Sequence, residues 1–285
     1  MLLGKKQQAE NWIMNHGHLK FECIHCHDTL KYDERGLTCQ NQHHFDIAKQ
    51  GYLFLTKTQT QSQYHQNLFE VRRQIILHSH FYDELHAKLY KLLLQYPVKS
   101  LLDAGSGEGS HLYHLTQKFK DITAVGVDLA KEGIRLSTDY NEHLLSIVAD
   151  LSVLPFKKHS FEGILSILSP SNYIEFHRVL TPEGLYIKVI PNEEYLIEIR
   201  RTMAKLALKE YQTYDNREVL AVFAKHFPNY SKEIAYQKVQ LTPQQKLQIT
   251  QMTPLTWSLS AEAQDAVAQA MPDEITLDVT ILYNR

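Results

Sequence analysis

Residues 99–109 read KSLLDAGSGEG, and this stretch decides the fold class of the chain. A short apolar strand runs into three glycines at alternate positions, and a helix from about Ser110 to Phe119 is expected to follow. The next strand, Thr123–Asp128, ends in an acid that stands 19 residues after Gly109. This pattern is typical of a nucleotide-cofactor site in an α/β fold, because glycine lets a cofactor approach the backbone and the acid can accept hydrogen bonds from ribose hydroxyls.

Two acids beside the glycines favour one class of cofactor. A dinucleotide site usually has the wider pattern G-x-G-x-x-G and offers helix amides to a pyrophosphate. Here the spacing is tighter, and the carboxylates of Asp103 and Glu108 would repel phosphate but attract the cationic cofactor S-adenosylmethionine. We therefore expect S-adenosylmethionine rather than NAD. The residues expected around it are Asp103 at its amino group, the turn glycines Gly105 and Gly109, Asp128 at the ribose, Asp150 at the adenine, and Leu151 beside Asp150.

Strands and helices continue to alternate after the turn, which predicts a doubly wound parallel sheet. Two strands near the C-terminus would complete a seven-stranded sheet with one reversed strand near its edge. The expected elements are strands at Leu144–Asp150 and Phe161–Leu168, a helix at Asn172–Val179, a turn at 180–184, a strand at Leu185–Ile190, helices at about Glu193–Lys209 and Asn216–His226, and strands at Ile234–Leu241 and Ile275–Tyr283.

The chain has three cysteines, and all of them fall near its N-terminus. Their order is Cys23-x2-Cys26-x12-Cys39, and His43 follows after three more residues. Pairs of ligands about a dozen residues apart can converge on one tetrahedral zinc ion, whereas an odd cysteine count argues against a disulfide framework. Four protein ligands leave no open position, so this zinc would be structural and would supply much of the segment's folding energy. The alternative fourth ligands are His25, His27 and His44.

The composition is that of an ordinary globular protein, with 44% hydrophobic and 22% charged residues among 285. A net charge of −2 argues against RNA binding by bulk electrostatics, so RNA recognition would need a local patch or shape. The sequence has neither an apolar run of the ~18–20 residues that a membrane span needs nor a secretory signal, so we expect a cytoplasmic protein without a membrane partner. The expected organisation is a helix and zinc-binding domain at 1–60, a linker and helix at 61–97, with Thr56–Gln66 as linker or loop, and a methyltransferase domain at 98–285.

Three further stretches resemble one family, the 23S ribosomal RNA guanine-N1 methyltransferases, which includes the tylosin-resistance methyltransferase. Residues 39–52 read CQNQHHFDIAKQGY and resemble the family pattern C-x3-H-x-F-D-x-A-K-x-G-Y. VRR at 71–73 resembles its A-R-R segment, and QMTPLTW at 251–257 resembles its Q-M-T-P-x2-W segment. The resemblance covers the chain from about Cys23 to its end. The departures are Val71 for Ala, Glu84 for Pro, Ser106 for Cys, Ser169 for Ala and Tyr195 for His.

The resemblance implies a class I S-adenosylmethionine-dependent methyltransferase with a Rossmann-like seven-stranded sheet and a small N-terminal zinc-ribbon-like domain. It implies S-adenosylmethionine and a structural Zn²⁺ as cofactors, and 23S ribosomal RNA as the partner. The reaction would methylate N1 of a guanine in a domain II hairpin loop near the peptide exit tunnel. The resemblance also implies a homodimer, which nothing else in the sequence indicates. The residues it adds or supports are the zinc ligands Cys23, Cys26, Cys39 and His43, and the cofactor contacts Tyr82, Gly107, Glu108 and Tyr195.

Residues after the fourth and fifth strands are expected to hold the target base. Catalysis of methyl transfer comes largely from aligning and desolvating the nucleophile, and the base would flip out of its loop to reach the pocket. Glu193 is a candidate general base, and the alternative is that it only starts a helix as a favourable charge. No general base is identified from the sequence. The residues expected around the base are Ser169, Pro170, Asn172, Tyr173, Asn192 and Glu193.

Basic and aromatic residues around the zinc segment are candidates for RNA contact. Tyr32, Phe45 and Tyr52 could stack on unpaired bases, although Phe45 and Tyr52 could instead fill the segment's small core. Arg72 and Arg73 could contact RNA or simply pair with acids on a helix. The basic candidates are Lys20, Lys31, Arg35, Lys49, Lys57, Arg72 and Arg73.

Two other functions remain open from the sequence. A small-molecule methyltransferase could use the same sheet, because fold does not fix function, but it would have little need of a zinc segment. A zinc-dependent RNA-binding or assembly factor with an inactive cofactor pocket is the other alternative. The intact acids Asp103, Glu108 and Asp128 argue against it.

Overall fold

The computed structural model describes residues 3–57, 66–119 and 121–284, and their contacts divide the chain into two compact units. The first unit contains the described residues before 66 together with 93–188, and the second contains 66–92 and 189–284. Most of the expected linker at Thr56–Gln66 lies outside the described residues. Within the described part of the chain, no helix has both the length and the apolar character needed to cross a membrane.

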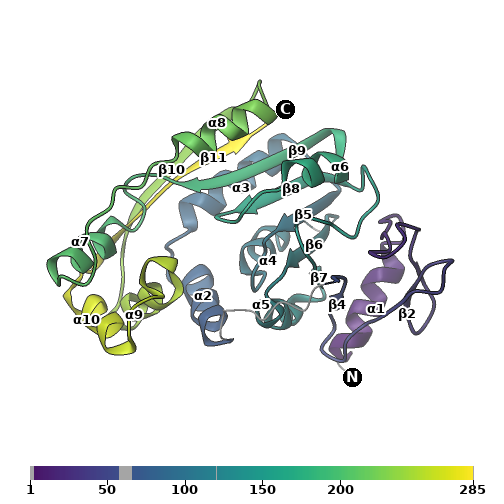
Figure 1. Cartoon of the computed structure of the whole chain (residues 1–285), viewed down its shortest axis with the longest axis horizontal. Helices are drawn as coiled ribbons and strands as arrows, with labels where there is room; N and C mark the ends of the chain where they lie inside the picture. Colours follow the sequence, from purple (N-terminus) through teal and green to yellow (C-terminus); the bar gives the residue numbers. More distant parts are fainter. Residues whose placement is uncertain (1–2, 58–65, 120, 285) are drawn as a thin grey trace. The chain divides into compact units, whose positions relative to one another are not determined.

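A largely parallel sheet is the core of the first unit (Figure 1). Parallel pairs link β5 to both β6 and β8, and β6 to β7, so that Ser100 lies opposite Thr123 and Ala124 opposite Leu144. Every residue of β5 and β7 is buried, as expected for strands covered on both faces. The carboxyl ends of the parallel strands share one edge, which brings the glycine turn next to Asp128. The strands are β5 (Ser100–Ala104), β6 (Thr123–Asp128), β7 (Leu144–Val148), β8 (Phe161–Ile167) and the part of β9 (Leu180–Pro191) that ends at Lys188.

The helices of this unit are short and lie between the strands in sequence. The helix after the glycine turn, α4, ends at Thr116 rather than at the expected Phe119. Asn172 caps the helix after β8, because its side-chain oxygen accepts a hydrogen bond from the backbone N–H of Glu175 at 3.2 Å. The helices are α4 (Ser110–Thr116), α5 (Lys131–Ser137), the 3₁₀ turn η1 (Thr138–Tyr140) and α6 (Tyr173–Val179).

The N-terminal segment packs on the sheet within the first unit. The short strand β4 (Leu53–Phe54) pairs in parallel with β7 and adds an edge strand that the sequence did not predict. Phe21 forms an isolated bridge with Phe156, and the two rings lie 5.6 Å apart. The sheet therefore supplies part of the core that this segment is too short to build alone. Its other elements are α1 (Lys5–Asn15) and an antiparallel sheet of β1 (Lys31–Tyr32), β2 (Gly36–Thr38) and β3 (His44–Asp46).

The second unit contains a long antiparallel strand pair and several helices. Strands β10 (Ser231–Gln240) and β11 (Glu274–Tyr283) pair in antiparallel fashion along their whole length. This agrees with the two late strands expected from the sequence. The helices are α2 (Gln66–His78), most of α3 (Asp83–Gln95), α7 (Ile197–Lys205), α8 (Arg217–His226), α9 (Pro243–Met252), the 3₁₀ turn η2 (Pro254–Thr256) and α10 (Ala261–Ala270).

Two predicted boundaries in the C-terminal half are wrong. The turn expected at 180–184 belongs to β9, which runs continuously from Leu180 to Pro191. The long helix expected from Glu193 begins only at Ile197 and ends at Lys205. Tertiary partners hold the residues before it, because the Asp278 carboxylate accepts a hydrogen bond from the Glu194 N–H at 3.1 Å. Backbone groups satisfied in this way do not need a helical turn.

Candidate active site and metal centre

All three glycines of the turn after β5 have left-handed backbone angles. The φ values are +86° at Gly105, +58° at Gly107 and +78° at Gly109, a region that is costly for residues with a Cβ. A Cβ added to Gly105 would lie 2.5 Å from Cβ of Ser169, and one added to Gly109 would collide with the Ser137 hydroxyl. The structure thus adds a reason for these glycines beyond cofactor approach, since the turn is packed closely against its own protein.

Asp128 stands beside the turn at the end of β6. One of its carboxylate oxygens accepts a hydrogen bond from the Gly107 N–H at 2.8 Å, and the other accepts one from the Ala130 N–H at 2.8 Å. The residue is half-buried. The residue therefore lies beside the turn, with its orientation fixed by two backbone donors.

The acids of the turn are buried more deeply than Asp128. Asp103 is 2% exposed and Glu108 is fully buried. Nearby, the hydroxyl of Ser106 is buried without a hydrogen-bond partner among the described residues. Carboxylates at this edge suit a positively charged ligand and disfavour a phosphate. The donor set around the turn fits S-adenosylmethionine, in agreement with the choice made from the sequence.

Asp150 and Leu151 follow β7 at the same edge of the sheet. The Asp150 carboxylate accepts a hydrogen bond from the Ser152 N–H at 2.8 Å, so it also organises the local turn. Leu151 approaches the turn closely, because its Cδ1 lies 4.0 Å from the position of a Cβ added to Gly105. The structure therefore brings Leu151 against the glycine turn.

Tyr82 and Tyr195 belong to the second unit, where the structure brings them together. Their hydroxyls lie 3.1 Å apart, and Phe81 packs edge-on against Tyr82 at 4.9 Å. Burial and the adjacent Tyr82 raise the pKa of Tyr195 well above its ordinary value, so its hydroxyl stays protonated. Tyr82 and Tyr195 are 113 positions apart in sequence and form one pair in the structure. Only the family resemblance had placed both of them at one site.

The loop after β8 packs against the glycine turn. Ser169 donates a hydrogen bond from its hydroxyl to the Ala104 carbonyl at 2.7 Å, and Pro170 next to it is exposed. Asn172 serves as the helix cap, and half-buried Tyr173 follows it. Ser169, one of the residues expected around the target base, thus contacts the glycine turn directly.

The loop after β9 is held by residues that the sequence analysis did not identify. Asp278 accepts a hydrogen bond from the Asn192 side chain at 2.8 Å, and Arg200 donates to the carbonyls of Glu193 and Tyr195. Glu193 is exposed and lies four residues before α7, so the interpretation that it starts this helix is wrong. The signal for Asp278 was weak, because one acid in a late apolar strand has no local partner in sequence.

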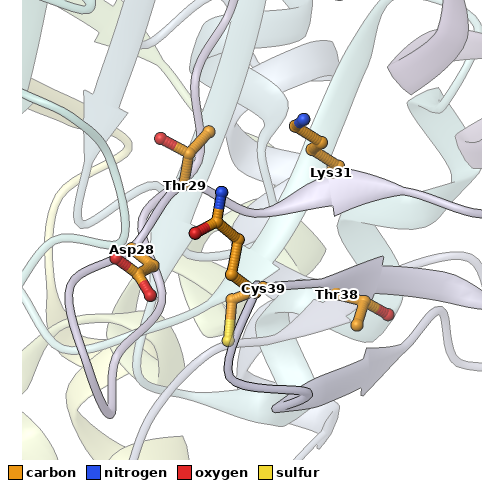
Figure 2. A pocket seen from close by; sticks show the side chains of 6 residues that line it. Asp28, Thr29, Lys31, Thr38 and Cys39 are labelled. Atoms are coloured by element: carbon orange, nitrogen blue, oxygen red, sulfur yellow. The ribbon is translucent and has the colours of Figure 1, made fainter.

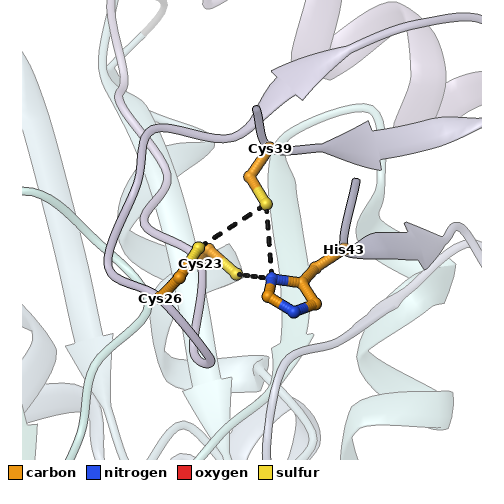
Figure 3. Close-up of side chains that lie close together, drawn as sticks. All are labelled: Cys23, Cys26, Cys39 and His43. Atoms are coloured by element: carbon orange, nitrogen blue, oxygen red, sulfur yellow. Dashed lines mark hydrogen bonds between the residues drawn. The ribbon is translucent and has the colours of Figure 1, made fainter. Parts of the chain in front are cut away.

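The three cysteines and His43 form one compact cluster (Figure 3). All their candidate ligand atoms lie within 4.8 Å of one another. Sγ of Cys39 is 3.4 Å from Nδ1 of His43 and 3.6 Å from Sγ of Cys26, and Sγ of Cys23 is 3.5 Å from the same nitrogen. A regular tetrahedron with Zn–S of about 2.3 Å and Zn–N of about 2.0–2.1 Å has edges of roughly 3.5–3.8 Å. The spacing therefore fits a zinc ion.

The surroundings of the cluster change the pKa values of two of its cysteines and distinguish His43 from the three other histidines. The hydrogen bond from the Asn41 side chain lowers the pKa of Cys26 to about 6, which favours the thiolate, whereas burial raises the pKa of Cys23. His25, His27 and His44 are absent from the compact cluster in the described residues. His25 instead stacks on Phe45 at 5.8 Å, and His44 contacts Thr38 at 2.8 Å.

The expected RNA-contact residues divide into surface and core positions. The five basic side chains at Lys20, Lys31, Arg35, Lys49 and Lys57 are exposed in the first unit, whereas the arginines 72 and 73 are half-buried on α2. The ring at position 52 packs in a core cluster with the side chains at 134 on α5 and 148 on β7, so Tyr52 contacts the α/β domain, whereas the alternative placed it in a small core of the zinc segment.

Comparisons with known proteins match both parts of the chain. Residues 21–62 match the zinc-ribbon family described as RlmA, N-terminal, and residues 101–184 match a methyltransferase domain. A Bacillus subtilis relative with the provisional name 23S rRNA (guanine-N(1)-)-methyltransferase YxjB is 34% identical over 92% of this chain and 95% of its own. The chain belongs to the 23S rRNA (guanine-N1)-methyltransferase family. A 23S rRNA (guanine(748)-N(1))-methyltransferase from Streptomyces fradiae is 26% identical over 92% of this chain and 95% of its own.

Among solved structures, a methyltransferase from Thiobacillus denitrificans in complex with S-adenosyl-L-homocysteine aligns with a TM-score of 0.48 at 16% identity, covering 77% of this chain and 97% of that one. As a member of this family, the chain is an S-adenosylmethionine-dependent methyltransferase with a zinc-ribbon segment before its α/β sheet. Its cofactors are S-adenosylmethionine and a structural zinc ion.

Proposed function

We propose that this protein transfers the methyl group of S-adenosylmethionine to N1 of a guanine in a domain II hairpin loop of 23S ribosomal RNA. One observation carries the proposal: the similarity to YxjB extends over 92% of the chain and so includes the zinc segment as well as the glycine turn. A small-molecule methyltransferase would need only the turn. The S. fradiae relative is named for guanine 748, which supports a target of the position 745 or 748 type here.

We assign the cofactor to the carboxyl edge of the sheet in the first unit. The cofactor supplies an electrophilic methyl group on a sulfonium. Asp128 would hold the ribose hydroxyls, Asp103 and Glu108 would provide negative charge near the cationic end, and the glycine turn would form the floor. Asp150 and Leu151 would lie at the adenine. The family resemblance adds Tyr82 and Tyr195 as further cofactor contacts. The buried carboxylates and the fixed orientation of Asp128 support this assignment.

The target guanine would lie over the loop that follows β8. Ser169 is hydrogen-bonded to the Ala104 carbonyl, so this loop borders the glycine turn. During transfer the N1–carbon bond forms as the sulfur–carbon bond breaks, and the N1 proton leaves to solvent or to a nearby group. Ser169, Pro170 and Asn172 would orient the base, and Glu193 is a candidate proton acceptor. Alignment and exclusion of water would supply most of the rate enhancement.

Zinc would be held by Cys23, Cys26, Cys39 and His43 and would order a segment for RNA recognition. A hollow of about 280 Å³ lies beside the cluster and is lined by residues on β1 and β2 and next to them (Figure 2). Its lining combines hydrogen-bonding side chains with one exposed base, Lys31, which suits a nucleotide of an unpaired loop. The residues that line it are Asp28, Thr29, Lys31, Thr38, Cys39 and Gln40.

The proposal is tested with purified, zinc-loaded protein and methyl-labelled S-adenosylmethionine. The substrates are a domain II hairpin transcript and versions in which each loop guanine is replaced in turn by adenosine. We expect 1-methylguanosine in the nuclease digest, lost in one replacement only. Cofactor binding without labelled RNA would favour another substrate. Failure to bind the cofactor would favour the RNA-binding factor. Asp128→Asn is the control for label that does not depend on the site.

A further inference from the structure

A buried lysine lies under the loop that borders the glycine turn. Lys188 is on β9, is only 5% exposed, and donates hydrogen bonds from Nζ to the Ser169 carbonyl at 3.2 Å and to the Ser171 hydroxyl at 2.7 Å. Both acceptors are uncharged. Among the residues that the structure describes, no carboxylate forms an ion pair with this ammonium. A buried charge with only neutral partners costs stability, so it calls for a reason other than folding.

The lysine is one end of a connected polar network. The Ser171 hydroxyl lies 2.8 Å from the hydroxyl of Tyr186 and 3.2 Å from that of Ser166, and Ser166 lies 3.0 Å from the hydroxyl of Ser169. Ser169 then donates to the Ala104 carbonyl at the start of the glycine turn. The network therefore runs without interruption from Lys188 to the turn.

The loop held by this network has little freedom at either side. Leu168 enters it with φ of +52°, a left-handed conformation that is disfavoured for leucine and persists only when neighbouring contacts enforce it. On the other side, Ser169 packs so closely on Gly105 that no Cβ fits between them. Lys188 donates a hydrogen bond to the Ser169 carbonyl and so fixes the peptide bond between Ser169 and Pro170.

We propose that Lys188 is a positioning residue that fixes the Ser169–Ser171 loop against the glycine turn, so that the loop presents the target base in line with the methyl group. The role of the loop toward the base rests on the proposed function. Burial lowers the pKa of Lys188 to about 8, so the ammonium form that donates all its hydrogen bonds predominates at neutral pH. A shift of the loop by about 1 Å would be enough to slow transfer by about 100-fold.

The test compares Lys188→Met with wild type and with Lys246→Met. Lys246 is a second buried lysine, 7% exposed, whose ammonium pairs with Asp273 at 2.9 Å in the second unit. We expect Lys188→Met to lower kcat for the hairpin by 10- to 100-fold while the Kd for S-adenosylmethionine changes less than threefold. Hydrogen exchange in a peptide covering 166–173 should become faster. Lys246→Met should leave kcat and that peptide unchanged.

Ser171→Ala is the second variant, because it removes one acceptor of Lys188 without changing the charge. It should shift kcat and exchange in the same direction by a smaller factor. The proposal is overturned if Lys188→Met keeps wild-type kcat and exchange, or if cofactor affinity and thermal stability fall in proportion to kcat. If wild type methylates no hairpin guanine, the proposed function fails, and the exchange of peptide 166–173 still decides the role of Lys188.

Discussion

Gly105→Ala tests the packing of the cofactor turn directly. The new methyl group would lie 2.5 Å from Cβ and 2.8 Å from Oγ of Ser169, whereas unstrained contacts are about 3.5–4.0 Å, so the loop would have to retreat by about 1 Å. Overpacking of this kind costs about 1–3 kcal/mol. The left-handed φ of +86° adds roughly 1–2 kcal/mol for alanine. We therefore expect the free energy of unfolding to fall by about 2–5 kcal/mol.

A double variant separates these two contributions. Ser169→Gly removes both atoms that the new methyl group would meet, so Gly105→Ala/Ser169→Gly should recover the packing cost of about 1–3 kcal/mol but not the cost of the backbone angle. The assay is urea unfolding followed by circular dichroism, with S-adenosylmethionine affinity measured on the same samples. Gly17→Ala is the matched control, because among the described residues a Cβ added at Gly17 would come within 4 Å of only the Met14 carbonyl, at 3.9 Å. It should change stability by less than about 0.5 kcal/mol.

Two results would refute this reasoning. Gly105→Ala with wild-type stability and cofactor affinity would mean that the turn is not packed as described. A double variant whose loss equals the sum of the two single losses would mean that residues 105 and 169 do not meet. Either result would leave the hydrogen bond from Ser169 to the Ala104 carbonyl as the remaining link between the loop after β8 and the cofactor turn.

Three further predictions concern the metal, the ribose acid and the buried lysine. His43→Ala should lose the single zinc ion per chain, measured by atomic emission, while His44→Ala keeps it. Zinc retained in both variants would mean that a residue other than His43 is the fourth ligand. Asp128→Asn should weaken S-adenosylmethionine binding at least tenfold by calorimetry, because one charge-assisted acceptor is lost, and an unchanged Kd would reject its ribose role. At pH 7, the free energy of unfolding of Lys188→Met should exceed that of wild type by up to roughly 3 kcal/mol, reduced by the contribution of the two lost hydrogen bonds. The Lys188 side chain binds its proton more tightly in the unfolded chain than in the folded one, so wild type regains stability as the pH rises from about 8 toward 10.5. Urea titrations that give the same stability difference between the two proteins at pH 7 and at pH 10 would contradict this prediction.

The elements predicted well are those whose signals are local. The glycine turn, the acid at the end of β6 and the cysteine spacing each depend on the chemistry of neighbouring residues, and the structure brings each group together as expected. The spacing favoured His43 as the fourth ligand, and the compact cluster includes it and no other histidine among the described residues.

The features that were missed depend on partners far away in sequence. The start of α7 is delayed because Asp278 and Arg200 satisfy backbone groups between β9 and the helix. Strand β4 forms because an edge of β7 is available to pair with it. In the sequence, Lys188 is one polar position in an apolar strand, and only the structure shows its hydrogen bonds to the Ser169 carbonyl and the Ser171 hydroxyl. Propensity and periodicity carry no information on such contacts.

We propose that this protein methylates N1 of a guanine in the domain II loop of 23S ribosomal RNA. The most direct measurement is primer extension on ribosomal RNA from cells with the gene, cells without it, and cells carrying the Asp128→Asn variant. A methyl group on N1 blocks the Watson–Crick edge and stops reverse transcriptase. We expect a stop at one loop guanine that disappears without the gene and is not restored by the variant. Identical stops in all three strains would contradict it.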